Sequence, residues 1–178
     1  MKAILFLLLW LPLAVGCKKN EIDALPPATQ TGANTFGCLV NGKAWVPQKG
    51  GLFTDKPVEG GYEGNAFGLK YCVWIQTTDK DGSGIDIYLR EVDSPKEYKL
   101  NQNIVGIYPT YGNPLSYAYY RNGDGNYITT AQHIGKVTII KADTIRGIVS
   151  GTFEFTGYNP KTKQILSITN GRFDVTHQ

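Results

Sequence analysis

The sequence predicts an all-β fold: a single antiparallel β-sandwich or partly closed β-barrel of about nine to ten strands. Apolar and polar residues alternate along several short runs, which is the two-residue repeat of half-buried strands, as in residues 85–90, 149–156 and 172–176. Turn-forming residues separate these runs, and no segment shows ten residues of convincing helical periodicity. The pattern does not distinguish a sandwich from a barrel.

The clearest strand lies near the C-terminus. Val149, Gly151, Phe153 and Phe155 occupy alternate positions, and residues 150, 152, 154 and 156 between them are polar. This alternation predicts one face in the core and one in water.

A hairpin is expected near the start of the fold. Asn41 and Gly42 separate two apolar runs at residues 36–40 and 43–46. A type I′ turn needs positive φ at both central residues, and Asn-Gly meets that need at little cost. Further turns are expected around residues 79–84, 122–125, 142–144 and 159–161.

The first sixteen residues have the composition of a signal peptide. Lys2 precedes an apolar run over residues 3–15, which is shorter than the roughly 20 residues that span a bilayer. The segment from Leu13 to Cys17 resembles a bacterial lipobox, in which the cysteine thiol becomes acylated. The alternative is an ordinary signal peptide with Cys17 at its boundary. We expect residues 1–16 to be a lipoprotein signal peptide and Cys17 to carry the lipid.

Residues 17–34 are expected to be the lipidated cysteine and a flexible tether. The segment has no aromatic residue and contains Pro26-Pro27, so its composition disfavours a packed core. Fully stretched, Lys18 to Asn34 would reach about 55–60 Å. Residues 35–178 are then the all-β domain.

Two blocks of sequence resemble a known family. Residues 25–42 with Trp45 and Pro47, and residues 148–155 with 168–175, are similar to the opening and closing segments of an uncharacterised family of Bacteroidetes-type outer-membrane lipoproteins, a domain of unknown function. The resemblance implies an outer-membrane lipoprotein of unknown activity. It carries over no catalytic or binding residue.

Motifs for catalysis are absent from the sequence. The two histidines, His133 and His177, do not stand at metal-ligand spacings, and no nucleophile motif is present. We therefore expect no enzyme, no metal and no cofactor. A hydrolase acting on envelope glycan or lipid stays an alternative, because two carboxylates about 5–9 Å apart would suffice and any β scaffold could supply them.

Two further cysteines, Cys38 and Cys72, fall in expected strands. An envelope protein experiences an oxidising environment, so they could form a disulfide, or they could be two buried thiols. Both interpretations give these cysteines a structural role.

Tyrosines are concentrated in one region. Six fall within twenty residues, at positions 108, 111, 117, 119, 120 and 127. Exposed on loops they would suit stacking against sugars or a protein, with Tyr108, Tyr111 and Tyr127 as ligand-binding residues and Arg121 as a hydrogen-bond donor. The alternative is cross-strand packing, with Tyr117 and Tyr119 on one face and Tyr120 on the other.

These observations predict a lipid-anchored, non-enzymatic lipoprotein of the outer membrane, on its periplasmic or cell-surface side, that binds a glycan or a protein partner. The net charge is +3 with basic residues scattered among acids, which disfavours nucleic acid as a partner. A further alternative is an accessory subunit of a larger outer-membrane complex. The membrane itself is an expected partner through the lipid at Cys17.

Overall fold

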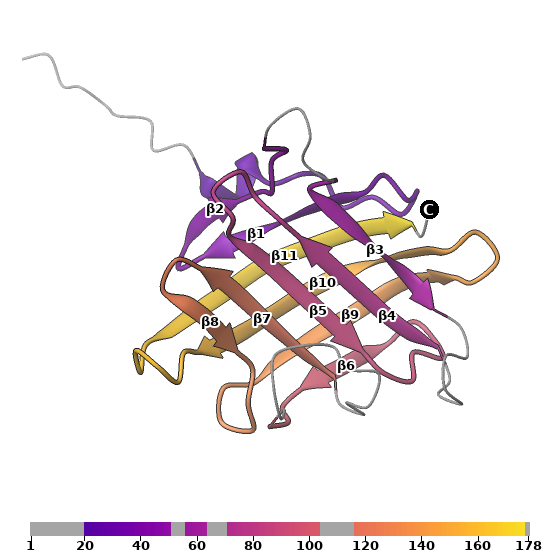
Figure 1. Cartoon of the computed structure of the whole chain (residues 1–178). Coiled ribbons are helices and arrows are strands. Elements are labelled where there is room, and N and C mark those ends of the chain that lie inside the picture. The colour runs from indigo at the N-terminus through magenta and orange to yellow at the C-terminus, as the bar shows by residue number, and fades with distance from the viewer. Residues whose placement is uncertain (1–19, 51–55, 64–70, 104–115, 177–178) are drawn as a thin grey trace, which may run out of the picture.

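The computed structural model describes residues 20–50, 56–63, 71–103 and 116–176. In these residues eleven strands form one curled antiparallel sheet, a half-barrel, which confirms the predicted all-β antiparallel fold (Figure 1). The strands are β1 (Thr35–Val40), β2 (Lys43–Trp45), β3 (Val58–Glu63), β4 (Cys72–Thr77), β5 (Gly84–Leu89), β6 (Glu97–Leu100), β7 (Tyr117–Asn122), β8 (Gly125–Ile128), β9 (Gly135–Asp143), β10 (Ile148–Tyr158) and β11 (Ile165–Thr176).

The sheet folds over at β10. Its order is β2-β1-β11-β10-β8-β7-β5-β4-β3, and β9 pairs with β10 as well, carrying β6 on its other side. Strand β10 bonds to β9 along residues 148–155 and to β8 only at Tyr158. The strands therefore form two layers, β6-β9-β10-β11-β1-β2 and β8-β7-β5-β4-β3, and β3 lies close to β11 where the half-barrel begins to close (Figure 1).

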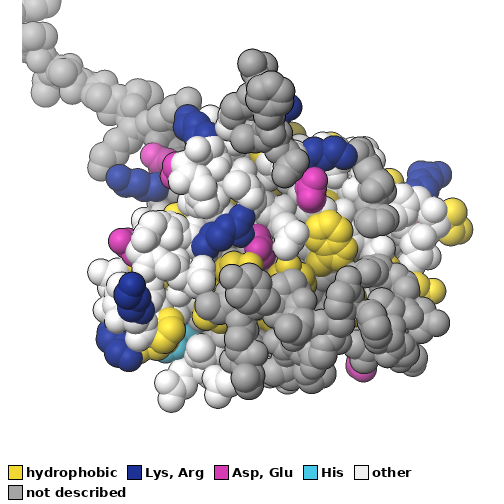
Figure 2. Space-filling view, in the orientation of Figure 1, with side chains coloured by type: hydrophobic (Ala, Val, Ile, Leu, Met, Phe, Trp, Pro, Cys, Tyr) yellow, Lys and Arg dark blue, Asp and Glu magenta, His cyan; other side chains and the backbone are white. Residues whose placement is uncertain are grey.

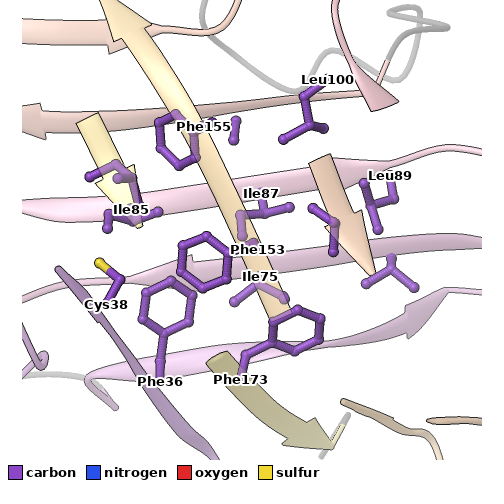
Figure 3. Packing of buried hydrophobic residues seen from close by; sticks show 14 of the residues in the cluster. Phe36, Cys38, Ile75, Ile85, Ile87, Leu89, Leu100, Phe153, Phe155 and Phe173 are labelled. Atoms are coloured by element: carbon purple, nitrogen blue, oxygen red, sulfur yellow. The ribbon is translucent and has the colours of Figure 1, made fainter. Parts of the chain in front are cut away.

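The hydrophobic core lies between the two layers (Figure 3). Phe153 packs against Phe36, with ring centroids 4.9 Å apart, and also against Phe155 and Phe173. The opposite layer contributes aliphatic side chains that are fully buried, namely Ile75, Ile85, Ile87 and Leu89. The alternation predicted for residues 149–156 holds for the apolar side, since all its residues are buried. In β5 and β11 the apolar residues predicted to face the core are likewise buried.

The Asn-Gly hairpin forms as predicted. Asn41 and Gly42 have φ angles of 49° and 81°, as a turn with two left-handed residues requires. Asn41 also fixes the turn to β11, because its Oδ1 accepts a hydrogen bond from Ser167 N at 2.9 Å and its own N donates to Ser167 O at 2.8 Å.

Residues 20–34, which we call the strap, lie along the domain, in contrast to the flexible tether expected for residues 17–34. The strap begins with a short 3-10 helix, η1 (Glu21–Ala24), and buries Leu25. Its end wraps the carboxylate of Asp174 in β11, which accepts hydrogen bonds from the Thr29 hydroxyl and from the backbone N–H groups of residues 31, 32 and 33. Composition missed this attachment because it depends on polar bonds rather than on apolar burial.

Burial alone would raise the pKa of Asp174, but these hydrogen bonds outweigh it and hold the pKa below its usual value. The strap also explains why Ser150 is buried although it lies on the outward face of β10. Ser150 is the cross-strand partner of Asp174, on which the strap lies. Cys17 and residues 1–16, where a signal peptide is expected, fall outside the described residues.

The structure does not join Cys38 and Cys72 in a disulfide. Cys38 is buried in the core, where burial raises the pKa of its thiol well above the usual value. Cys72 is half-buried in β4, and its Sγ accepts a hydrogen bond from Arg90 Nη1 at 3.1 Å. Among the described residues no helix is long and apolar enough to cross a membrane.

Close packing at Gly135 generates a test of the fold. A Cβ at this position would lie 2.3 Å from Phe155 Cβ and 2.7 Å from the carbonyl oxygen of Glu154. We expect Gly135→Ala to lower the free energy of unfolding by about 1–3 kcal/mol in urea denaturation, since the backbone must move to relieve this overpacking. Gly123→Ala is the control, because its Cβ would meet nothing within 4 Å. Equal stability of the two variants would contradict the packing described here.

Candidate ligand-binding surface

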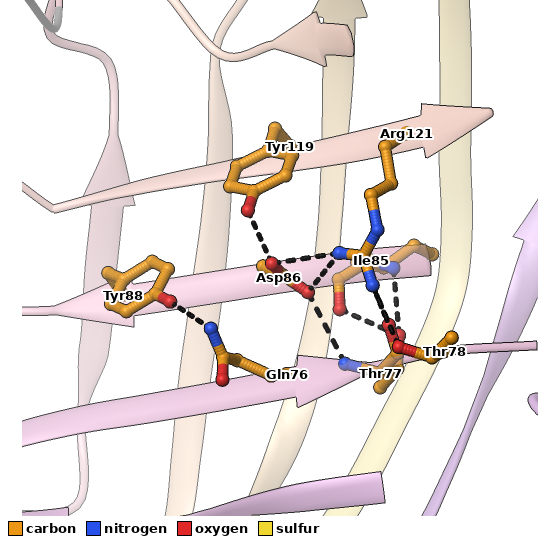
Figure 4. Close-up of polar contacts among 8 residues, drawn as sticks. All are labelled: Gln76, Thr77, Thr78, Ile85, Asp86, Tyr88, Tyr119 and Arg121. Carbon is orange, nitrogen blue, oxygen red and sulfur yellow. Dashed lines mark hydrogen bonds and ion pairs between the residues drawn. The ribbon is translucent and has the colours of Figure 1, made fainter. Parts of the chain in front are cut away.

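Two outward-facing surfaces are candidates for a ligand-binding site, one on each layer. The first is the outer face of β4, β5 and β7, where Asp86 lies at the centre of a polar network (Figure 4). Asp86 accepts a hydrogen bond from the Tyr119 hydroxyl, and Nη1 of Arg121 lies 2.9 Å from both of its carboxylate oxygens. Arg121 Nη2 donates to Thr77 O at 2.7 Å and to the hydroxyl of Thr78 at 2.8 Å. The network ties three adjacent strands together.

Burial decides the electrostatics of this network. Asp86 is 2% exposed, and burial raises the pKa of its carboxyl group, while the bonds from Tyr119 and Arg121 act in the opposite direction. Burial and the nearby Asp86 raise the pKa of Tyr119 far above its usual value. Tyr119 therefore stays protonated and serves as a hydrogen-bond donor.

Tyrosine rings stack beside the network. The centroids of Tyr88 and Tyr117 are 5.0 Å apart, and those of Tyr117 and Tyr119 are 6.4 Å apart. Tyr117 and Tyr119 are buried, and the hydroxyl of Tyr88 accepts a bond from Gln76 at 2.7 Å. Figure 2 views this face and shows hydrophobic, basic and acidic side chains next to one another. Apart from the buried Tyr117 hydroxyl, which has no hydrogen-bond partner among the described residues, these rings and polar groups are engaged with one another. This face, which we call the tyrosine framework, therefore holds the strands in place.

Of the residues predicted to bind a ligand, the two that the structure describes, Arg121 and Tyr127, lie on opposite faces of the sheet. Tyr108 and Tyr111 lie outside the described residues. Arg121 is on the outer face, whereas Tyr127 is the cross-strand partner of Tyr120, faces the core and is 4% exposed. The Tyr127 hydroxyl donates to Gln164 at 2.8 Å. Successive residues of a strand point to opposite faces, so the pairing of Arg121 with Asn126 puts Arg121 and Tyr127 on different sides.

The second surface is a groove on the outer face of the other layer. It consists of two adjoining depressions of about 460 and 570 Å³ that share Lys136, Glu154 and Thr169. Its polar lining comes from β6, β9, β10 and β11 and the residue after β6, namely Glu97, Lys99, Asn101, Lys136, Thr138, Thr152, Glu154, Thr156, Ser167, Thr169, Asn170 and Arg172. Apolar residues also border it, namely Ala28, Ile134, Phe153, Phe155 and Ile168.

A bend in the central strands lies under this groove. The pairing of β10 with β11 shifts register between Phe153 and Phe155, and that of β1 with β11 shifts between Gly37 and Leu39. Both shifts fall on the same stretch of β11, where Asn170 has a φ of 53°. An irregularity of this kind bends a strand and turns its side chains in a new direction. The groove therefore follows a local kink in the sheet.

The groove offers uncommitted polar groups. Lys136 lies between Glu97 and Glu154, with Nζ–Oε distances of 3.3 and 3.5 Å, and these three side chains are about half exposed. Within the described part of the chain, several hydroxyl and amide side chains of the groove form no hydrogen bond, namely those of Asn101, Thr138, Thr152, Thr156, Ser167, Thr169 and Asn170. This distinguishes the groove from the tyrosine framework, whose Asp86 and Arg121 are already bonded.

Sequence reasoning missed the groove because threonine and serine are ordinary residues on the wet face of a strand. Only the pairing of β9, β10 and β11 assembles them into one surface. As for metals, the described residues contain no group of three or more His, Cys, Asp and Glu side chains that could hold an ion.

The structure thus defines an all-β half-barrel with one outer face internally bonded and a polar groove on the other. A family model described as a domain of unknown function (DUF6252) matches residues 94–175, just under half of the chain. No curated protein and no solved structure matches. The matched segment runs from just before β6 to the end of β11 and contains every polar groove residue named above, whereas β4, β5 and the strap lie outside it.

The framework role of Asp86 can be tested by stability. Asp86→Ala leaves Arg121 and Tyr119 without their shared acceptor, so we expect the free energy of unfolding to fall by about 2–4 kcal/mol; this is less than for a fully buried pair because Arg121 is partly exposed. Gln76→Ala, on the same face but exposed, should change it by about 0.5 kcal/mol or less. Urea denaturation monitored by fluorescence measures both. A loss below 1 kcal/mol for Asp86→Ala would refute the framework role.

Proposed function

We propose that this chain is a lipid-anchored lipoprotein of the outer membrane that binds an oligosaccharide in the groove. The observation that carries the binding proposal is the set of unbonded hydroxyl and amide side chains that β6, β9, β10 and β11 present together. The signal-peptide composition of residues 1–16 and the lipobox-like segment ending at Cys17 support the anchor.

The chemistry of the groove favours a neutral, hydroxyl-rich ligand. Hydroxyl and amide groups both donate and accept hydrogen bonds, so they complement the hydroxyls of a sugar. The charges of Lys136, Glu97 and Glu154 compensate one another, which gives little attraction to a polyanion. Each depression falls within the usual size of ligand clefts, about 300–1,000 Å³, and two in succession suit an elongated chain of sugars.

The hydrolase alternative has one observation in its favour, because the carboxylates of Glu97 and Glu154 both lie within 3.5 Å of Lys136 Nζ and so form a close pair in the groove. Both side chains are about half exposed and engaged by that lysine. A glycan hydrolase needs a protonated carboxyl group facing the substrate. Asp86 has a raised pKa, but its carboxylate is engaged by Tyr119, Arg121 and Thr77. An accessory subunit would be favoured by a continuous apolar patch. The exposed large apolar residues of the described chain are instead distributed over several elements. They are Ile22 in η1, Tyr71 just before β4, Ile140 in β9, Ile134 and Ile145 on either side of β9, and Ile165 in β11.

The groove can be tested with an oligosaccharide array probed with the acylated protein in detergent, followed by titration calorimetry with the ligand that binds best. Thr138→Val and Thr152→Val remove one hydroxyl each and keep the β-branched shape. Together they should weaken binding about tenfold, since each lost hydrogen bond contributes about 0.5–1.5 kcal/mol.

Gln76→Ala on the tyrosine framework is the matched control and should leave the affinity unchanged. Failure of every oligosaccharide to bind would refute the proposal. An equal loss in the Gln76 variant would move the site to the other face.

The anchor is tested by Cys17→Ser. We expect the wild-type chain to incorporate radiolabelled palmitate and to sediment with outer membranes on a sucrose gradient. The variant should lose the label and leave the membrane fraction, because it lacks the acyl chains that anchor the wild-type chain. Retention of the label in the variant would show that Cys17 is not the acylated residue.

A further inference from the structure

The strap is attached to the domain from its first residues. Asn20 Oδ1 accepts a hydrogen bond from Ile22 N at 3.2 Å and caps η1. Glu21 Oε2 accepts a hydrogen bond from Ala44 N at 2.8 Å, which ties η1 to the edge of β2. The folded structure therefore includes residues from Asn20 on, and not only those from Thr35 on.

Contacts continue along the strap. Pro26 O accepts a hydrogen bond from Arg172 Nη1 at 3.3 Å, and Lys141 Nζ donates to Gln30 O at 2.8 Å. At the end of the strap, Asn34 Oδ1 accepts from Thr176 N at 3.0 Å. Strands β9 and β11 thus hold the strap at several separate points.

Asp174 is the strongest of these points. Asp174 is only 1% exposed. The strap donates hydrogen bonds to both of its carboxylate oxygens, including one from Gly32 N to Oδ1 at 2.8 Å and one from Thr29 Oγ1 to Oδ2 at 2.7 Å. Release of the strap would leave these donors and this carboxylate to find new partners. Charge-assisted bonds of this kind are stronger than neutral ones, so the carboxylate favours the attached state.

The covalent length of the chain then limits where the domain can lie. Only Lys18 and Lys19 stand between Cys17 and Asn20. Three consecutive Cα–Cα steps span at most about 10–11 Å, compared with the 55–60 Å of a free tether that reaches Asn34.

We propose that the strap seats the end of the domain formed by η1 and β2 against the lipid headgroups of the membrane that holds the anchor. This inference rests on the proposed acylation of Cys17. The surface at this end includes Ile22, which is 38% exposed, and the exposed Lys43, an apolar and a cationic side chain that both tolerate a headgroup layer. It also carries the exposed acids Glu21 and Asp23, so its contact with headgroups relies on the short chain to Cys17 rather than on net positive charge. The turn between β9 and β10 lies on the opposite side of the molecule and points away (Figure 1).

The test uses the acylated full chain reconstituted in phosphatidylethanolamine–phosphatidylglycerol vesicles. Proteinase K should leave residues 20–34 uncut in the wild type, as mass spectrometry of the products reports. Asp174→Ala should be cut within this segment at least tenfold faster and shed its domain from the vesicles. Asp124→Ala removes an acid from the β7–β8 turn, far along the chain from the strap, and should behave as the wild type does.

Neutron reflectometry on supported bilayers of the same lipids measures the placement. The wild type should show no water layer thicker than about 10 Å between headgroups and protein. A variant with fifteen Gly and Ser residues inserted between Lys19 and Asn20 should show a thicker layer, which provides the matched control.

The outcomes separate the two claims. Absence of acylation at Cys17 would overturn the proposed anchor and this inference with it. An acylated chain whose strap is cut as fast in the wild type as in Asp174→Ala, or whose water layer equals that of the insertion variant, would overturn the inference alone.

Discussion

One edge of β10 pairs with two different strands, β9 and β8, and the rest of this structure depends on that arrangement. Because β10 bonds to β9 along most of its length and to β8 at Tyr158, the sheet divides into two layers at this strand. The aromatic side chains of β10 and β11 then face the aliphatic residues of β4 and β5 across the core. The irregular pairing of β10 with β11 also bends the outer surface on which the groove lies.

The two outer faces differ in how far their polar groups are satisfied. On the tyrosine framework, Asp86 and Arg121 form bonds that join β4, β5 and β7, so a ligand would have to break them. On the groove, Thr138 and Thr152 lie opposite one another in neighbouring strands with their hydroxyls unbonded by the described chain. Bonded polar groups thus stabilise one face, and unbonded ones remain available for recognition on the other.

Local patterns predicted the strands and turns well, because the alternation around Phe153 and the Asn41-Gly42 turn depend on near neighbours. Strand parity also placed Tyr119 and Tyr120 on opposite faces, and it could have separated Arg121 from Tyr127 had the β7–β8 register been considered. The strap could not be predicted in this way. Its attachment depends on Asp174, more than 140 residues away in sequence, and the composition of the strap carries no trace of that partner.

Arg172 belongs to both the groove and the attachment of the strap. Its guanidinium lines one of the depressions and also donates to the carbonyl of Pro26, and Ala28 borders the same depression. A ligand that took the Nη1 donor of this guanidinium would compete with Pro26 for it, and occupancy of the groove and attachment of the strap would then be linked equilibria. By the reciprocity of linkage, release of the strap would then change the affinity of the groove by the same factor as ligand binding changes the equilibrium between attached and released strap.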